Sequence, residues 1–178
     1  MTLHQLESST SHLHLPAAAT ADICDANPGA RVLLSWFASF GGKGRCAGPV
    51  EIVSTRDDNS LVKTVLQEPG AGRVLLIDNQ GSCTCAMIGG GLAQLAVDNG
   101  WAGIIVNGAV RDTAELKETP LAIFALAPSP RKSINRGVGK RGLPIRVGSE
   151  RITPDDFLVA DADGVVVLAS RTAMGESN

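Results

Sequence analysis

The chain has 178 residues, of which 44% are hydrophobic and 19% charged. This composition excludes a disordered protein, and the length allows burial of about 70% of the unfolded surface. The formal net charge of −2 excludes a strong overall attraction to nucleic acids or acidic membranes. Aromatic residues make up only 3% and Tyr is absent, so the core must consist of Val, Ile, Leu and Ala, as in buried parallel or mixed sheets.

The expected location is the cytoplasm. No apolar run approaches the length of a membrane span, and the first residues lack the basic start and apolar core of a signal peptide. The four Cys residues show no metal-site spacing and are too few for a disulfide framework. We therefore expect reduced thiols and a protein that binds neither membranes nor nucleic acids.

Residues 1–19 are polar and then Ala-rich, and they predict a flexible N-terminal arm. Residues 20–178 predict one domain without an internal repeat. All three histidines, His4, His12 and His14, fall in the arm. A Ser-His-Asp or Cys-His mechanism is therefore not expected, and general base catalysis would depend on a carboxylate or a metal-bound water.

The segments after the arm alternate between strand and helix patterns. Helices are expected at residues 20–25, 60–67, 91–99 and 113–118. Strands are expected at residues 49–55, 73–78, 104–107, 121–127, 145–147 and 165–168, and residues 31–40 form a further apolar run. The order strand, helix, strand across residues 73–107 is a βαβ unit, which is expected to be parallel and right-handed. The fold class predicted from this pattern is α/β.

The run Gly89-Gly90-Gly91, followed by Leu92, begins the third predicted helix. Glycines let a backbone approach a ligand closely, and a helix start offers free N–H groups and a partial positive charge. The spacing matches neither a Walker A loop nor a dinucleotide fingerprint. Binding of an anion and tight packing of the helix against a sheet are both compatible with this pattern.

Arg111 and Asp112 follow the buried strand at residues 104–107. Open α/β sheets bind ligands beyond the carboxyl ends of their strands. An Arg there offers a fork for a carboxylate, and an Asp offers an oxygen ligand for a hard cation. The alternative is a solvated pair in which Asp112 caps the following helix. Together with the glycine run, the pair favours a site for a small carboxylate and a divalent metal.

Two further features are given structural interpretations. Residues 131–146 carry six basic side chains, no acidic one and no aromatic one for base stacking, which favours a solvated or subunit-contacting loop over a nucleic-acid site. Cys83 and Cys85, next to the glycine run, are interpreted as small buried side chains.

Seven short motifs in this chain resemble the RraA-like family, which is named for regulators of ribonuclease E activity and also contains class II 4-hydroxy-4-methyl-2-oxoglutarate aldolases. The resemblance spans about residues 20–168. The motifs are Phe40-Gly41-Gly42, Cys46-Ala47-Gly48-Pro49, Gly89-Gly90-Gly91-Leu92, Asn99-Gly100-Trp101 with Gly108-Ala109-Val110-Arg111-Asp112, Pro130-Arg131-Lys132-Ser133, and Asp161-Ala162-Asp163-Gly164.

The resemblance implies a single-domain α/β/β/α sandwich of the swivelling phosphohistidine-domain type. It also implies a ring-shaped homotrimer, with clefts between subunits, that can pair into a hexamer. Gly89, Gly90, Gly91, Leu92 and Arg111 would bind a small 2-oxo acid, Arg111 and Asp112 would be catalytic, and Asp112 would hold Mg²⁺ or Mn²⁺, largely through waters. At position 90, where efficient aldolases of the family carry an acidic residue, this chain has Gly.

The implied activity is cleavage of 4-hydroxy-4-methyl-2-oxoglutarate to two pyruvates through a pyruvate enolate, with oxaloacetate decarboxylation as a side activity. The alternative is a non-catalytic regulator that binds ribonuclease E. Members known for that role lack the Asp of the Arg-Asp pair, so Asp112 favours the enzyme. A methyltransferase of menaquinone synthesis is disfavoured, because no glycine-rich adenosylmethionine loop follows Ile77-Asp78.

Overall fold

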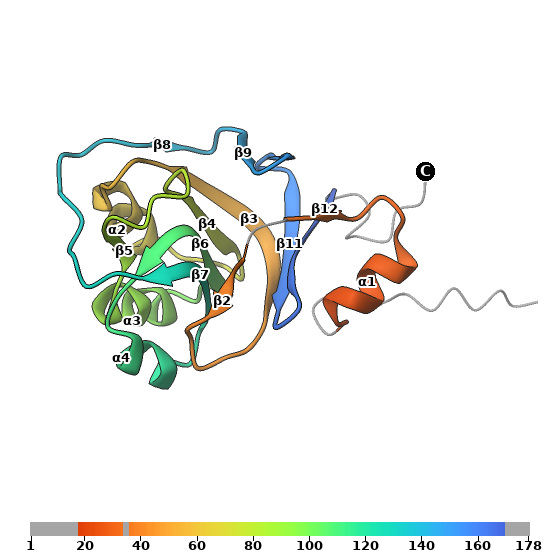
Figure 1. The fold of residues 1–178 in the computed structure, drawn as a ribbon, viewed down its shortest axis with the longest axis horizontal. Helices are drawn as coiled ribbons and strands as arrows, with labels where there is room; N and C mark the ends of the chain where they lie inside the picture. Colours follow the sequence, from red (N-terminus) through yellow and green to blue (C-terminus); the bar gives the residue numbers. More distant parts are fainter. Residues whose placement is uncertain (1–17, 34–35, 170–178) are drawn as a thin grey trace, which may run out of the picture.

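The computed structural model describes residues 18–33 and 36–169, in which one curled mixed sheet of ten strands carries helices on two sides (Figure 1). The helices are α1 (Thr20–Ala26), α2 (Ser60–Leu66), α3 (Gly90–Asp98) and α4 (Thr113–Glu118). The strands are β1 (Arg31–Val32), β2 (Ala38–Ser39), β3 (Cys46–Ser54), β4 (Val74–Asp78), β5 (Ala86–Ile88), β6 (Gly103–Val110), β7 (Ala122–Pro128), β8 (Lys140–Arg141), β9 (Ile145–Val147), β10 (Glu150–Ile152), β11 (Asp156–Asp161) and β12 (Gly164–Ala169). The predicted arm lies almost wholly outside the described residues.

The sheet has a parallel centre and antiparallel flanks. Its order is β1-β12-β11-β3-β4-β6-β7-β2, with β5 pairing to β6 and β8 to β3, while β9 and β10 form a separate hairpin. Strands β3, β4, β6 and β7 run parallel, and every residue of β4 and β6 is buried. Because both faces of β4 and β6 are covered, their central residues, 74–77 and 104–106, are continuously apolar rather than alternating. The predicted parallel pairing across residues 73–107 is confirmed.

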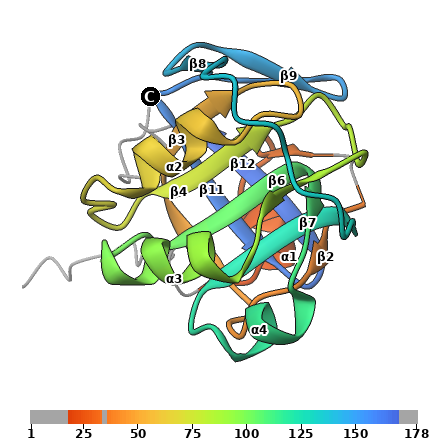
Figure 2. The same ribbon diagram turned by 90° about the vertical axis from the view of Figure 1, so that its left-hand side faces the viewer.

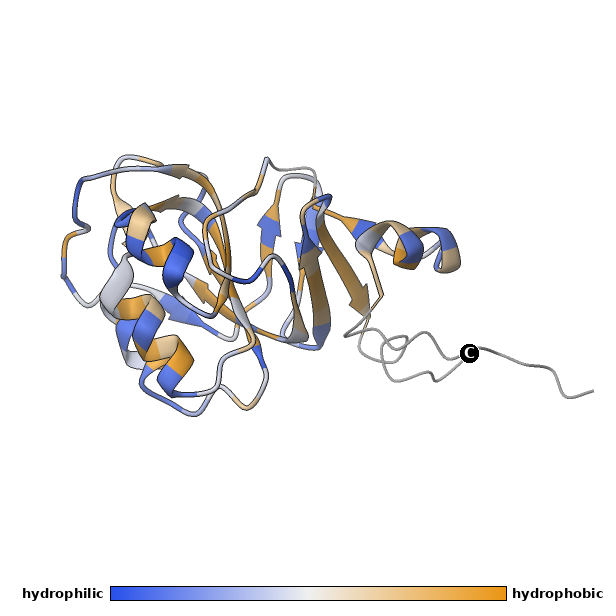
Figure 3. Cartoon of the chain, turned by 90° about the horizontal axis from the view of Figure 1, so that it is seen from below, coloured by the Kyte–Doolittle hydropathy of each residue, from blue (hydrophilic) through white to orange (hydrophobic). Residues whose placement is uncertain are grey.

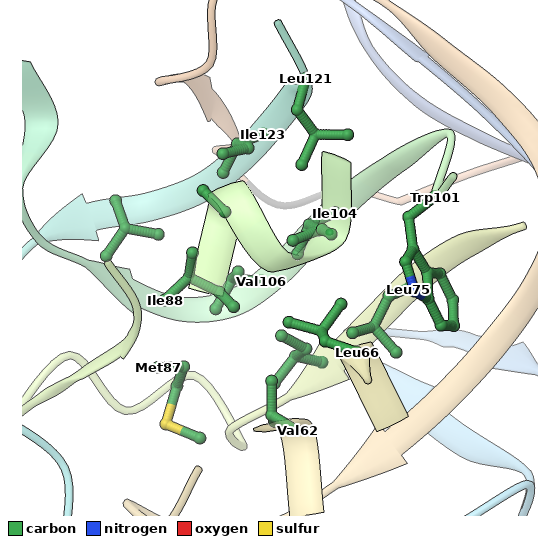
Figure 4. Packing of buried hydrophobic residues seen from close by; sticks show 14 of the residues in the cluster. Val62, Leu66, Leu75, Met87, Ile88, Trp101, Ile104, Val106, Leu121 and Ile123 are labelled. Carbon is green, nitrogen blue, oxygen red and sulfur yellow. The ribbon is translucent and has the colours of Figure 1, made fainter. Parts of the chain in front are cut away.

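One core lies between the sheet and helices α2 and α3, which stand in front of β4, β6 and β7 in Figure 2. Leu75, Ile104 and Val106 point from the strands toward Val62 and Leu66 of α2 (Figure 4). Trp101 closes the end of this core, with its indole N–H donated to the Glu68 carbonyl at 3.2 Å.

Two further cores lie on other faces of the curled sheet, one inside the curl and one outside the β11–β12 hairpin. Leu76, Ile105 and Phe124 point into the curl, where they meet Leu158 and Val167 of the β11–β12 hairpin. The outer face of that hairpin packs against α1. Hydrophobic residues accordingly dominate the strands, whereas the helices carry both classes (Figure 3).

Helix α1 is fixed at the far end of the molecule by the carboxylate of Asp161. The Thr20 hydroxyl donates to Oδ1 at 2.6 Å and the Thr20 N–H donates to Oδ2 at 2.8 Å. The α/β class is confirmed. The two β layers of the expected sandwich are parts of one curled sheet, because β3 pairs with β4 on one side and with β11 on the other.

The helices begin and end close to their predicted bounds, but several strands differ. Strand β6 runs on through Asn107-Gly108 to Val110, because neighbouring strands pair with it on both sides of that dipeptide and the Asn107 amide donates to Asp78 at 2.9 Å. Strands β5, β8, β10 and β11 are absent from the prediction. No helix within residues 18–33 and 36–169 is long and apolar enough to cross a bilayer.

Candidate functional site

The turn after β6 places Arg111 and Asp112 at the carboxyl end of the parallel sheet. The Arg111 N–H donates to the Ile88 carbonyl at 2.9 Å, which ties the turn to β5. Asp112 has the left-handed conformation (φ 58°, ψ 41°), which Asp tolerates better than most residues, and α4 begins directly after it. The chain therefore reverses over two residues and leaves both side chains at the sheet edge.

The Asp112 carboxylate links this turn to the start of α3. Its Oδ2 accepts the Gly90 N–H at 3.1 Å and lies 3.6 Å from Nε of Arg111. Both side chains are a little over one third exposed. The alternative in which Asp112 caps its own helix does not hold, because its side chain makes no cap hydrogen bond to α4 and binds α3 instead.

The glycines at the start of α3 make room for carboxylates. A Cβ at Gly89 would lie 2.5 Å from Oδ2 of Asp112, and a Cβ at Gly90 would collide with Oε2 of Glu115 from α4. A Cβ at Gly91 would meet nothing within 4 Å. These contacts come from the α4 side and not from the sheet, so helix-to-sheet packing does not explain the glycine run.

A cleft of about 440 Å³ opens beside this turn, a volume within the range of small-molecule sites. It is lined by Asn59, Lys63, Gln67, Ala86, Gly89, Gly91, Leu92, Leu95, Arg111, Asp112, Lys132 and Asn135. The cleft thus brings together all the predicted site residues except Gly90. Gly90 lines a neighbouring cleft of about 590 Å³ together with Glu115.

The first turn of α3 adjoins this cleft through Gly91 and Leu92. The N–H groups at the start of a helix generally lack a partner within the helix, and they carry the positive end of the helix dipole. The Gly90 N–H donates to Asp112, and the Leu92 N–H donates to the Gly89 carbonyl at 3.1 Å. Gly91 lines the cleft together with Arg111. A carboxylate there would meet backbone N–H and guanidinium donors together.

Sequence reasoning missed the other wall of the cleft. Lys63, on α2, and Lys132 and Asn135, after β7, line it. Lys132 belongs to the basic segment that was interpreted as a solvated or subunit-contacting loop, and for this residue that interpretation is incomplete. A basic segment was the available signal, but nothing local indicates that it borders α3.

A buried carboxylate holds the two parts of this wall together. Asp58, 1% exposed, accepts the Ser60 N–H through Oδ1 at 2.8 Å. Its Oδ2 accepts the N–H groups of Arg136 at 2.6 Å and Val138 at 3.4 Å. Burial alone would raise the pKa of Asp58, but the hydrogen bonds from Ser60 and the two loop amides prevail and hold this pKa below its usual value.

The cysteines near the glycine run take no part in the cleft. Cys85 is buried, and burial, followed by the nearby charge of Asp57, raises the pKa of its thiol. Cys83 is partly exposed, so the prediction that both would be buried is wrong for Cys83. A raised pKa disfavours the thiolate, which is the nucleophilic form.

Residues 20–167 match the family model described as RraA-like, Aldolase/RraA. A Burkholderia mallei (strain SAVP1) protein, provisionally named 4-hydroxy-4-methyl-2-oxoglutarate aldolase, is 50% identical over 155 residues, which cover 84% of this chain and 94% of that protein.

Two solved structures are similar in both fold and sequence. The RNA-processing inhibitor RraA from Thermus thermophilis has a TM-score of 0.82 and 46% identity, covering 85% of this chain and 92% of that one. A Geobacillus kaustophilus HTA426 structure, named S-adenosylmethionine: 2-dimethylmenaquinone methyltransferase, has a TM-score of 0.84 and 37% identity, covering 90% and 100%. The chain belongs to the RraA-like family.

Proposed function

We propose that this protein is a divalent-metal-dependent lyase that cleaves 4-hydroxy-4-methyl-2-oxoglutarate into two pyruvates, with oxaloacetate decarboxylation as a side activity. The observation that carries the proposal is the cleft in which Arg111, Asp112 and the first turn of α3 adjoin one another. The name of the Burkholderia mallei relative supports the same reaction.

Binding in this proposal follows the charges of the cleft. The substrate's 2-oxo acid end lies against Gly89, Gly91 and Leu92, where the Gly91 N–H, which has no partner among the described residues, is available to its carboxylate. The Arg111 guanidinium donates to the keto oxygen and to the same carboxylate. Gly90 contributes through its backbone, since its N–H fixes the Asp112 carboxylate.

Cleavage breaks the C3–C4 bond of the substrate. A general base takes the proton of the C4 hydroxyl, which becomes the keto group of one pyruvate, while the bonding electrons pass to the other pyruvate as its enolate. The enolate then gains one proton at C3, so no proton is gained or lost overall. Negative charge develops on the C2 oxygen, and in this proposal the Arg111 guanidinium stabilises it. Loss of CO₂ from oxaloacetate leaves the same enolate, so one site serves both reactions.

The donor set at Asp112 fits a hydrated hard cation. Within the described residues no three His, Cys, Asp or Glu side chains come together as a metal site, so protein ligands to a cation would be few. Asp112 and Glu115 place carboxylate oxygens where side chains at Gly89 and Gly90 would otherwise begin. Mg²⁺ is commonly held by one or two carboxylates while keeping several waters. When bound, such a cation supplies positive charge that polarises the keto oxygen.

The test is pyruvate release from 4-hydroxy-4-methyl-2-oxoglutarate and from oxaloacetate, followed with coupled lactate dehydrogenase. We expect release with Mg²⁺, loss with EDTA, and loss of turnover without unfolding in Arg111→Ala and Asp112→Ala. Arg146→Ala and Asp155→Ala, which change exposed residues outside the cleft, are the matched controls. Full activity in Asp112→Ala would refute Asp112 as the metal ligand. If pyruvate is released from neither compound, the proposed lyase activity is refuted.

The second candidate is a non-catalytic regulator of ribonuclease E. The 46% identity to the Thermus RNA-processing inhibitor supports it. The discriminating measurement is the rate of ribonuclease E cleavage with this protein in excess. An unchanged rate counts against the regulator, whereas inhibition that survives in Arg111→Ala would count against the lyase as the main role.

We also propose that the chain is a cytoplasmic homotrimer, able to pair into a hexamer, with the α/β/β/α architecture of swivelling phosphohistidine domains. The resemblance to the RraA-like family supports this proposal. Sedimentation equilibrium tests the assembly, and a single monomeric species at micromolar concentration would refute it.

A further inference from the structure

Two lysines occupy the wall of the cleft that the proposed chemistry leaves unused. Lys63 projects from α2 and Lys132 from the loop after β7, and both line the same cleft as Arg111. Neither lies within ion-pair distance of a carboxylate of the described residues. Arg111 is balanced by Asp112, so the cleft keeps two uncompensated positive charges.

Strand β5 sets the spacing between these charges. The Arg111 N–H binds the Ile88 carbonyl, while the Ala86 N–H binds the carbonyl of Arg131 at 2.8 Å, directly before Lys132. The two attachment points are two residues apart, which is roughly 7 Å along a strand. The side chains of Arg111 and Lys132, which start near these two points, can contact the two ends of one small extended ligand.

The backbone that carries the lysines is held in place. The Asp58 carboxylate joins the start of α2 to the loop at Arg136 and Val138, as described above. The Asn59 amide donates to the Met87 carbonyl at 3.1 Å, which fixes the start of α2 against β5. The backbone at the two lysines is therefore held relative to Arg111, and Lys132 itself forms a β-bridge with Ala86 of β5.

We infer that Lys132, assisted by Lys63, forms a second anion subsite that binds the distal carboxylate of a 2-oxo dicarboxylate. Binding the 2-oxo acid end at Arg111 leaves that carboxylate four C–C bonds from the first, on the side of β5 where Lys132 begins. The subsite makes the cleft selective for dicarboxylates over monocarboxylates of the same length. This inference rests on the proposed function, since it takes Arg111 as the anchor of the 2-oxo acid.

The test compares two ligands that are not cleaved because they lack a C4 hydroxyl. 2-Oxoglutarate and 2-oxopentanoate have the same chain length and differ in carrying a distal carboxylate or a methyl group. Dissociation constants are measured by titration calorimetry with Mg²⁺ at fixed ionic strength. The variants are Lys132→Met and Lys63→Met, with Lys140→Met, outside the cleft but in the same basic segment, as control.

We expect wild type to prefer 2-oxoglutarate at least about tenfold, as one charge-assisted contact would provide. Lys132→Met should remove most of this preference and Lys63→Met a smaller part, while affinity for 2-oxopentanoate stays unchanged in both. The Lys140→Met control should keep the full preference.

Three outcomes would overturn the inference. An unchanged preference in both variants would refute the subsite while leaving the proposed function intact. Equal weakening of both ligands in Lys132→Met would indicate a structural role for the lysine. Failure of wild type to bind either ligand would refute the subsite and the proposed 2-oxo acid site together.

Discussion

Replacement of Asp58 by Asn tests the carboxylate that joins α2 to the loop after β7. Asn keeps one oxygen for the Ser60 N–H, but its amide nitrogen then faces the N–H groups of Arg136 and Val138. The Arg136 bond is short, at 2.6 Å, and charge-assisted, and the Val138 bond is long, at 3.4 Å. A charge-assisted hydrogen bond contributes about 1.5–3 kcal/mol, so the free energy of unfolding should fall by about 3 kcal/mol in total. For a chain of this length that corresponds to a Tm lower by about 6–12 °C at pH 7.

The loss of stability in Asp58→Asn should depend on pH in a defined direction. The folded-state pKa of Asp58 lies below its unfolded value of about 3.9, so the stabilisation is complete above that value and is lost as pH falls through the folded pKa. At pH 7, Asp58→Asn should therefore unfold at a lower temperature than both wild type and the exposed control Asp155→Asn, and the three should converge in acid. Amide exchange at Arg136 and Val138 should accelerate in the variant. If the Tm of Asp58→Asn lies within about 2 °C of the wild-type Tm at pH 7, the stabilising role of the Asp58 carboxylate is refuted.

Two further predictions concern the glycine run and α1. Gly91→Ala should raise the free energy of unfolding by about 0.5–1 kcal/mol in urea titrations, because a Cβ there meets nothing within 4 Å, whereas Gly90→Ala should give no such gain, since its Cβ enters space held by the Glu115 carboxylate. Equal gains would show that Glu115 does not occupy that space. Asp161→Asn should lower Tm at pH 7 but not in acid, because hydrogen bonds, opposed by burial, lower the pKa of Asp161 and its contribution disappears once it is protonated. A Tm difference that persists at pH 3 would contradict this.

The strands that could be predicted are those buried on both faces. The runs at residues 74–77 and 104–106 are apolar without interruption, and the glycine and proline residues around them indicate where the strands begin and end. Strand β5 has only three residues and follows a turn rich in small polar side chains, so no periodicity could develop. Strand β11 exists because of its partners: it pairs with β12 in a hairpin and with β3, more than one hundred residues earlier.

The site shows the same division. Arg111-Asp112 and the glycine run could be placed together because adjacent parallel strands end at one edge of a sheet, and the structure does place them together. Lys63 and Lys132 could not be added, because their approach depends on hydrogen bonds that amides far along the chain donate to Asp58. Such bonds have no signature in local sequence. The role of all these residues in catalysis remains a prediction.

Strand β3 also has consequences for how the chain folds. Its first half, up to Pro49, pairs with β11, and its second half, from Val50, pairs with β4. One continuous strand thus serves both the helix-covered core and the core inside the curl, so neither can detach without exposing an unpaired edge of the other. Denaturation of the subunit should proceed in one cooperative transition. Because the β3–β11 pairing closes a very long loop, refolding should be slow, in the range of milliseconds to seconds typical of non-local sheets.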